Sequence, residues 1–265
     1  MLDCSAMPGA RPTLLFAHGM YMNATSWAPW VGRAEAAGFE PLVPSWPYHD
    51  GAPAELRRHI DPQLGRLTFG RVVQHYTDVI STLAEPPLVI GHSVGGLVVQ
   101  RLLNDGLVRA GVAISSAPPL GVISFDPHFF RANLPHVNPF AGNRPVVMTP
   151  ERFHYTFCNT MSRAASDRVF EQYVVPESRN VPRSTLTRSG KIDFRRDHGP
   201  LLFIAGDADH LCPLRTVARN AMAYRRSPRP ARLRAFTGRS HLICNQEGWE
   251  EVADAAFAFL RTSVS

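Results

Sequence analysis

Residues 87–103 place a serine between two glycines, where a strand pattern changes into a helix pattern. The apolar run Leu88–Ile90 stops at Gly91, and helical spacing of apolar residues begins at Leu97. A turn this tight crowds the backbone, so glycine is favoured on both sides of Ser93 because it has no Cβ atom. The Gly-x-Ser-x-Gly pattern therefore predicts an exposed serine hydroxyl beside the first N–H groups of a helix.

This spacing is not specific by itself. A chain of this length would contain it by chance about one time in ten, given the usual frequencies of glycine and serine. Its position between a strand and a helix is what favours a nucleophilic serine over a turn that only packs closely. The rest of the sequence has to supply the partners that such a serine needs.

Short apolar runs and helical patterns alternate along most of the chain. The runs expected to be strands are Thr13–Ala17, Phe39–Val43, Pro87–Gly91, Val108–Ser115, Leu201–Gly206 and Ala231–Phe236. The stretches expected to be helices are Ser26–Ala37, Val72–Leu83, Leu97–Asn104, Pro213–Tyr224 and Glu247–Leu260. Because the strands are apolar on both faces, we predict an α/β fold with a mostly parallel sheet and helices on both faces.

The stretch of residues 117–197 breaks this alternation. It shows no clear strand, and it is rich in aromatic residues and prolines, which argues against a disordered linker. We expect it to be a helical lid inserted before the penultimate strand, with residues 1–116 and 198–265 forming the core. Most of its aromatic side chains should form a small core of their own. A minority should line a substrate pocket, for which the candidates are Phe125, Phe129 and Phe157.

Composition limits the possible partners. With 265 residues and 45% hydrophobic composition, the chain can bury one large core. The net charge of +6 comes almost entirely from arginine, since Lys191 is the only lysine. The arginine-rich stretch 215–239 lacks interleaved aromatic residues, which favours a solvated face over a nucleic-acid site. We therefore expect a small-molecule partner and no nucleic acid, and the oligomeric state is left open.

The sequence also gives no sign of export or of a metal site. Residues 1–11 hold no apolar run of signal-peptide length, and no stretch reaches membrane-spanning length, so we expect a cytoplasmic protein without membrane contact. The cysteines lack metal-binding or redox spacing and are expected to be reduced thiols: Cys4, Cys158, Cys212 and Cys244. Cys212 and Cys244 each follow a candidate catalytic residue by three positions, although small buried residues are the commoner role. No metal or organic cofactor is predicted.

A nucleophilic serine needs a base and an acid that orients the base. His241 lies in the loop after the last expected strand, from which it could return to Ser93. Asp207 and Asp209 both follow the strand that ends near Ile204 and compete for the role of the acid.

At this point the chain resembles the α/β-hydrolase family, from Thr13 to Leu260. In that family the acid commonly follows this strand in a Gly-x-x-Asp pattern with a proline a few residues later. Gly206 and Pro213 stand in that register, so the resemblance implies Asp209 as the acid. The chain order of nucleophile, acid and histidine is also that of the family.

A second feature of the resemblance is His18-Gly19 directly after the first expected strand. It implies that the backbone N–H groups of Met20 and Val94 form an oxyanion hole, which would stabilise a tetrahedral intermediate. His18 is expected at the substrate site, where it would brace this loop rather than take part in the chemistry. The chain departs from the family after the second strand, where it has Pro44–Gly51 in place of Asp-x-x-Gly-x-Gly. There His49 and Asp50 could contact substrate, but we expect a solvent-facing loop.

The resemblance implies a serine hydrolase acting on a carboxylic ester or related acyl compound through an acyl-enzyme. The same fold and triad also serve perhydrolases of the haloperoxidase type, C–C bond hydrolases, hydroxynitrile lyases and acyltransferases. A ligand-binding, receptor-like protein that retains the triad is a further alternative. The substrate and its acyl chain length are not predicted, since a fold does not fix a function.

Overall fold

A computed structural model describes residues 11–137 and 139–264 of the chain. Residues 1–10 lie outside the described part, and with them Cys4 and most of the stretch considered above for a signal peptide. Residues 138 and 265 are also outside it.

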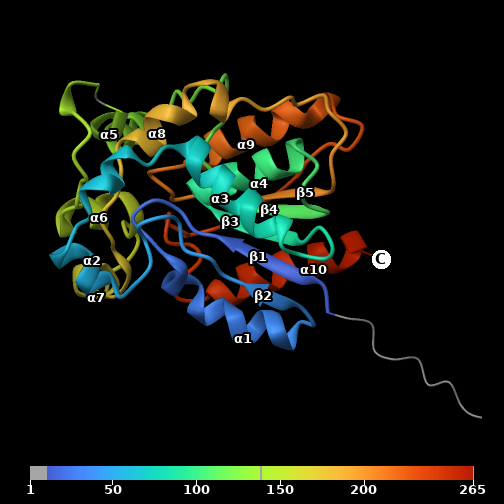
Figure 1. Ribbon diagram of the computed structural model, residues 1–265, viewed down its shortest axis with the longest axis horizontal. Helices are drawn as coiled ribbons and strands as arrows, with labels where there is room; N and C mark the ends of the chain where they lie inside the picture. The colour runs from blue at the N-terminus through green and yellow to red at the C-terminus, as the bar shows by residue number, and fades with distance from the viewer. Residues whose placement is uncertain (1–10, 138, 265) are drawn as a thin grey trace, which may run out of the picture.

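The centre of the molecule is a six-stranded parallel sheet (Figure 1). In sequence, the strands are β1 (Thr13–Ala17), β2 (Glu40–Leu42), β3 (Leu88–His92), β4 (Ala110–Ile114), β5 (Leu201–Gly206) and β6 (Arg232–Phe236). In space, their order is β2-β1-β3-β4-β5-β6. All six expected strands are present, and the predicted α/β fold is confirmed.

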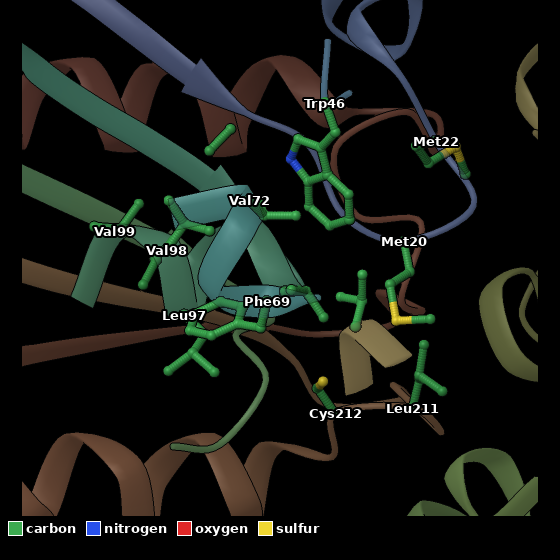
Figure 2. Close-up of a cluster of buried hydrophobic side chains, with 14 of the residues drawn as sticks. Met20, Met22, Trp46, Phe69, Val72, Leu97, Val98, Val99, Leu211 and Cys212 are labelled. Atoms are coloured by element: carbon green, nitrogen blue, oxygen red, sulfur yellow. The ribbon is translucent and has the colours of Figure 1, made fainter. Parts of the chain in front are cut away.

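Helices cover both faces of this sheet because neighbouring strand residues point to opposite sides. Leu14 and Phe16 pack into the core beneath α1 (Ala28–Ala36) and α10 (Trp249–Val264). Leu15 and Ala17 belong to the core on the other face, beneath α3 (Phe69–Ser81), α4 (Val94–Asn104) and α9 (Leu214–Ala223). Figure 2 shows part of this second core, where Trp46, Phe69, Val72 and Leu97 pack together.

One edge strand differs from the expectation. The runs were expected to be apolar on both faces, yet four of the five residues of β6 are exposed. Because β6 pairs only with β5 among the described strands, it lies at the rim of the sheet, where charged side chains remain in water. Its exposed arginines, Arg232 and Arg234, belong to the arginine-rich stretch.

The 117–197 segment is helical and contains no strand among its described residues. Its helices are α5 (Pro127–Val137), α6 (Pro150–Phe157), α7 (Arg163–Tyr173) and α8 (Asn180–Thr185), with 3-10 turns at Pro139–Ala141 and Arg188–Gly190. An isolated antiparallel bridge joins Val146 to Glu177. These four helices gather at one end of the sheet, on the left in Figure 1, together with α2 (Pro53–Arg58), which sequence analysis did not predict.

Three further 3-10 turns complete the described secondary structure: Ala24–Trp27, Pro62–Arg66 and Tyr224–Arg226. None of the described helices is both long and apolar enough to cross a membrane.

Candidate active site

Ser93 lies at the junction of β3 and α4 with a backbone conformation that side chains rarely adopt, at φ 58° and ψ −120°. Such a conformation costs about 1–3 kcal/mol and persists only where the surroundings enforce it. The surroundings are close-packed: a Cβ on Gly91 would lie 2.2 Å from the Gly95 carbonyl oxygen, and one on Gly95 would lie 2.1 Å from that of Ala17. Gly91 is therefore required by close packing within the turn, and Gly95 by the packing of the turn against the end of β1.

Asp209 and His241 form a buried pair, although 32 residues separate them in the sequence. His241 Nδ1 lies 2.7 Å from Asp209 Oδ2, and both side chains are 0% exposed. The other carboxylate oxygen, Oδ1, accepts hydrogen bonds from the backbone N–H groups of Leu211 (2.7 Å) and Cys212 (2.8 Å). Asp209 is thus held at both oxygens.

This environment keeps Asp209 ionised. Burial would raise the pKa of the carboxyl group, but neighbouring His241, the Cys212 N–H and the adjacent Ser115 hydroxyl together bring it below 3.8. An ionised carboxylate only accepts hydrogen bonds, so His241 Nδ1 is the donor. Asp207, the competing candidate, lies in a different environment, where it is exposed and accepts a hydrogen bond from the backbone of Gly238 (2.7 Å).

The second ring nitrogen of His241 is left unpaired. Nε2 is buried and has no hydrogen-bond partner among the described residues. The imidazole is packed on one side by the edge of Phe157, at 4.9 Å between ring centres, and on another by His92 at 4.7 Å. A nitrogen with a lone pair and no donor is poised to accept a proton.

His92 links the serine turn to the His241 loop. Its Nε2 donates a hydrogen bond to the backbone carbonyl of His241 at 2.8 Å. Burial, with His241 close by, lowers the pKa of His92 to about 3, so its ring is neutral. His92, directly before Ser93, therefore holds the backbone of His241 in place. The Gly-x-Ser-x-Gly motif did not predict this contact.

The loop after β1 approaches Ser93 from the other side. A Cβ on Gly19 would lie 2.8 Å from Ser93 Cβ, so only glycine fits there. His18 accepts a hydrogen bond from the Trp46 N–H at Nε2 (2.9 Å), which leaves Nδ1 to donate to the Gly19 carbonyl (2.9 Å). Burial lowers the pKa of His18 well below 6.5, in keeping with this neutral form.

The His18 bond also orients the neighbouring N–H group. A trans peptide points its C=O and N–H in opposite directions, and the described chain contains no cis peptide. Holding the Gly19 oxygen therefore fixes the direction of the Met20 N–H. Neither this group nor the Val94 N–H has a hydrogen-bond acceptor among the described residues.

A cavity of about 290 Å³ opens over Ser93. Its core-side lining comes from residues that follow four parallel strands: Met20, Tyr21, Ser93, Val94, Ala117, Pro118, Leu211 and Cys212. Its outer lining comes from α5, α8 and the residue that follows α8: Phe129, Phe130, Asn133, Leu134, Pro182, Thr185 and Leu186. None of these residues carries a charge. Figure 2 shows Met20 and Leu211 near one another on the right of the buried cluster, with Cys212 below Phe69; Met20, Leu211 and Cys212 all line the cavity.

Three of the four side chains expected to contact substrate do not line this cavity. Phe129 does line it. Phe125 precedes α5, is 72% exposed and lies under the guanidinium group of Arg219. Phe157 is buried at the end of α6, where it packs on His241 instead. His18 has both ring nitrogens engaged by the backbone and stacks on Trp46.

The pocket residues that sequence reasoning missed come mainly from α5 and α8. Helical spacing pairs Phe129 with Asn133 and Phe130 with Leu134, four residues apart, but the face that carries them could not be selected without knowing where α5 begins. Leu186 follows α8 and is not aromatic, so it was not among the aromatic residues considered as pocket candidates. Cys212 was a weak candidate for the site, and it does line the cavity.

The described cysteines are buried and free: Cys158, Cys212 and Cys244. Burial raises the pKa of the Cys212 thiol well above 9, so it stays protonated. Within the described residues, no group of three or more His, Cys, Asp or Glu side chains is arranged to hold a metal ion.

Comparison with known proteins places the chain in a family. Residues 14–255 match the alpha/beta hydrolase family, and the chain belongs to that family. Comparison with curated protein sequences finds no match.

Solved structures share the whole fold at low sequence identity. A monoacylglycerol lipase from Paleococcus ferrophilus has a TM-score of 0.70 at 19% identity, covering 96% of this chain and 95% of its own. A candidate non-heme bromoperoxidase from Mycobacterium tuberculosis has a TM-score of 0.70 at 19% identity, with 95% and 92% covered. A polyneuridine aldehyde esterase has a TM-score of 0.68 at 15% identity, with 94% and 98% covered. These likenesses concern the fold.

Proposed function

We propose that the protein is a serine hydrolase that cleaves a carboxylic ester, or a related acyl bond, through an acyl-enzyme. The observation that carries this proposal is the buried Asp209–His241 pair with its unpaired Nε2, tied through His92 to the turn that presents Ser93. Serine hydrolases of this fold use a serine, a base and an orienting acid, and Ser93, His241 and Asp209 offer that set in the expected chain order.

In the proposed reaction, Ser93 Oγ attacks the carbonyl carbon of the ester and passes its proton to His241 Nε2. The tetrahedral intermediate collapses, the bond to the alcohol oxygen breaks, and Nε2 returns the proton to that oxygen. Water then attacks the acyl-Ser93 and gives a proton to Nε2. The second collapse releases the carboxylic acid, and the proton returns to Ser93 Oγ.

The oxyanion of both tetrahedral intermediates would be stabilised by the Met20 and Val94 N–H groups. Two observations support this assignment: both residues line the cavity with Ser93, and both N–H groups lack another acceptor within the described structure. Loss of one such donor typically costs about 10²–10³ in rate.

The lining of the cavity favours an uncharged, partly apolar small molecule as the substrate. A charged substrate group would lose its hydration there without gaining a charged partner. We propose that residues 117–197 act as the lid, because α5 and α8 supply the outer wall. A small molecule of this kind, rather than a nucleic acid or a membrane, is the proposed partner.

The test uses p-nitrophenyl esters of increasing acyl length and a fluorophosphonate probe. Ser93→Ala should lose activity by at least about 10³-fold, and the probe should label Ser93 in the wild-type protein only. Ser116→Ala is the control, since Ser116 is buried nearby but does not line the cavity. Full activity in Ser93→Ala, or labelling of another residue, would overturn the proposal. Bromination in acetate with peroxide, measured alongside, distinguishes a perhydrolase from an esterase.

A further inference from the structure

Glu177 reaches from the 117–197 segment to the loop that follows β1. Its Oε2 accepts a hydrogen bond from the Tyr21 backbone N–H at 3.2 Å, and its Oε1 accepts one from the Ser178 N–H at 2.6 Å. The segment also holds Tyr21 from its other side, because the Val175 N–H donates to the Tyr21 carbonyl at 3.0 Å. Tyr21 itself has a left-handed backbone at φ 63°, which these contacts enforce.

His49 faces Glu177 in the same buried position. His49 Nε2 lies 3.4 Å from Glu177 Oε2, and both side chains are 0% exposed. This overturns the expectation of a solvent-facing loop at His49. Asn23 reinforces the arrangement by donating to the carbonyls of His49 and Gly51, at 3.0 Å each.

The hydrogen bonds define the protonation of His49. Its Nδ1 lies 3.0 Å from the Pro47 carbonyl oxygen, which can only accept, so Nδ1 carries a proton. A neutral ring would then turn the lone pair of Nε2 toward a carboxylate, which is repulsive. The pair is therefore an imidazolium beside a carboxylate. The pKa of His49 agrees, since burial lowers it but the charge and proximity of Glu177 raise it above 6.5 overall.

Met20 lies between two peptides that are both held. His18 fixes the Gly19–Met20 peptide through the Gly19 oxygen, and Glu177 fixes the Met20–Tyr21 peptide through the Tyr21 N–H. The planar peptide leaves φ and ψ of Met20 as the remaining soft torsions between them. The direction of the Met20 N–H is thus constrained from both ends.

We propose that Glu177 and His49 are positioning residues for the oxyanion hole, through which the 117–197 segment holds the Met20 N–H in its working direction. This inference rests on the proposed function. Glu177 supplies the acceptor for the Tyr21 N–H, and His49 balances the negative charge that this acceptor places beside a developing oxyanion. A buried ion pair seldom gains much stability over apolar packing, so a positional role accounts for its presence better than stability does.

The test is Glu177→Gln, which keeps the size of the side chain. Glutamine has one acceptor oxygen where Glu177 uses two, so either the Tyr21 or the Ser178 N–H faces a donor instead. The matched control is Ser178→Ala. Ser178 Oγ donates to the Leu67 carbonyl at 2.8 Å, so the control removes a buried contact between the same segment and the core without touching the β1 loop.

The readouts are kcat and KM on the best p-nitrophenyl ester, and the inhibition constant of a boronic acid that forms a tetrahedral adduct on serine. Glu177→Gln should lower kcat about tenfold with KM within about twofold, since it misdirects one donor rather than deleting it. The boronic acid should bind more weakly by a similar factor. Ser178→Ala should keep kcat and the inhibition constant within about twofold of the wild-type values. Thermal unfolding compares the stability of the two variants.

Equal losses in the two variants, or a kcat within twofold of the wild type in Glu177→Gln, would overturn the inference. If Glu177→Gln does not fold, His49→Gln is tested in its place. The inference predicts a smaller fall in kcat at constant KM for His49→Gln, and an unchanged kcat would contradict it. Ser93→Ala distinguishes a failure of this inference from a failure of the proposed function. If it abolishes activity while Glu177→Gln and His49→Gln change nothing, only the inference fails; if Ser93→Ala stays active, the proposed function fails and the inference with it.

Discussion

Two buried imidazole–carboxylate pairs lie beside the cavity, and they differ in what their second nitrogen can do. In the Asp209–His241 pair, Nδ1 is held at 2.7 Å by the carboxylate and Nε2 has no partner within the described residues. In the Glu177–His49 pair, Nδ1 is held by the Pro47 carbonyl and Nε2 faces the carboxylate at 3.4 Å.

The difference separates proton transfer from positioning. A ring with one anchored and one unpaired nitrogen can take up and return a proton without moving. His49 Nε2 also makes no hydrogen bond within the described residues, but it faces a carboxylate oxygen at an ion-pair distance of 3.4 Å, so this ring holds charge and geometry. Neither burial nor a free nitrogen alone therefore marks a catalytic histidine; in His241 the informative sign is a carboxylate at Nδ1 combined with an unpaired Nε2.

Replacing each of the two histidines by glutamine should give the largest difference in kcat between the two pairs. His241→Gln removes the proposed base and should lower kcat by about 10⁴-fold or more, while His49→Gln should lower it by between about twofold and tenfold. Steady-state hydrolysis of one p-nitrophenyl ester measures both. Comparable losses in the two variants would show that the distinction between the pairs is wrong.

Replacing the two carboxylates by amides gives a smaller contrast. Asp209→Asn should lower kcat by about 10²–10⁴-fold, because the amide can turn a donor toward His241 Nδ1 and favour the wrong tautomer. Glu177→Gln is expected to cost about tenfold, since the proton path stays intact. The control is Asp207→Asn, two residues away and exposed, which should stay within about twofold of the wild type. A larger loss in Asp207→Asn than in Asp209→Asn would exchange the roles of the two aspartates.

The sequence could predict the first pair and not the second. Both aspartate candidates and His241 follow expected strands, which brings them toward the sheet edge where Ser93 lies, and the resemblance to the family then implied Asp209 over Asp207. Glu177 is 156 residues from Tyr21, in a segment whose described residues form no strand, and no short motif connects them. The loop that carries His49 is polar and rich in proline, which is typical of an exposed turn. Its burial becomes visible only once the 117–197 segment is packed over it.

The lining of the cavity shows the same limit of prediction from sequence. Phe125 and Phe129 were equivalent candidates in the sequence, but α5 begins at Pro127, so Phe125 precedes the helix and lies outside the face that lines the cavity. Phe157 was expected at the substrate and instead packs on the His241 ring. Residue type predicted an apolar wall here, while the start and packing of each helix decided which side chains form it.

The two pairs should also respond to opposite ends of the pH range, which is the smallest of the expected effects. Folding brings the pKa of Asp209 below 3.8, so its contribution to the free energy of unfolding is present above that value and is lost as the pH falls through the folded-state pKa. Folding raises the pKa of His49 above 6.5, so its contribution is present below 6.5 and is lost as the pH rises through the folded-state pKa.

Urea unfolding of the wild type, Asp209→Asn and His49→Gln between pH 3 and pH 9 measures these two contributions as differences from the wild type. The difference for Asp209→Asn should shrink toward the acid end, and that for His49→Gln should shrink toward the alkaline end. Differences that shrink at the same end would mean that His49 is neutral in the folded protein. Glu177 would then lack a cationic partner in His49, and the charge balance proposed for the oxyanion loop would fail even if the hydrogen bond to Tyr21 remained.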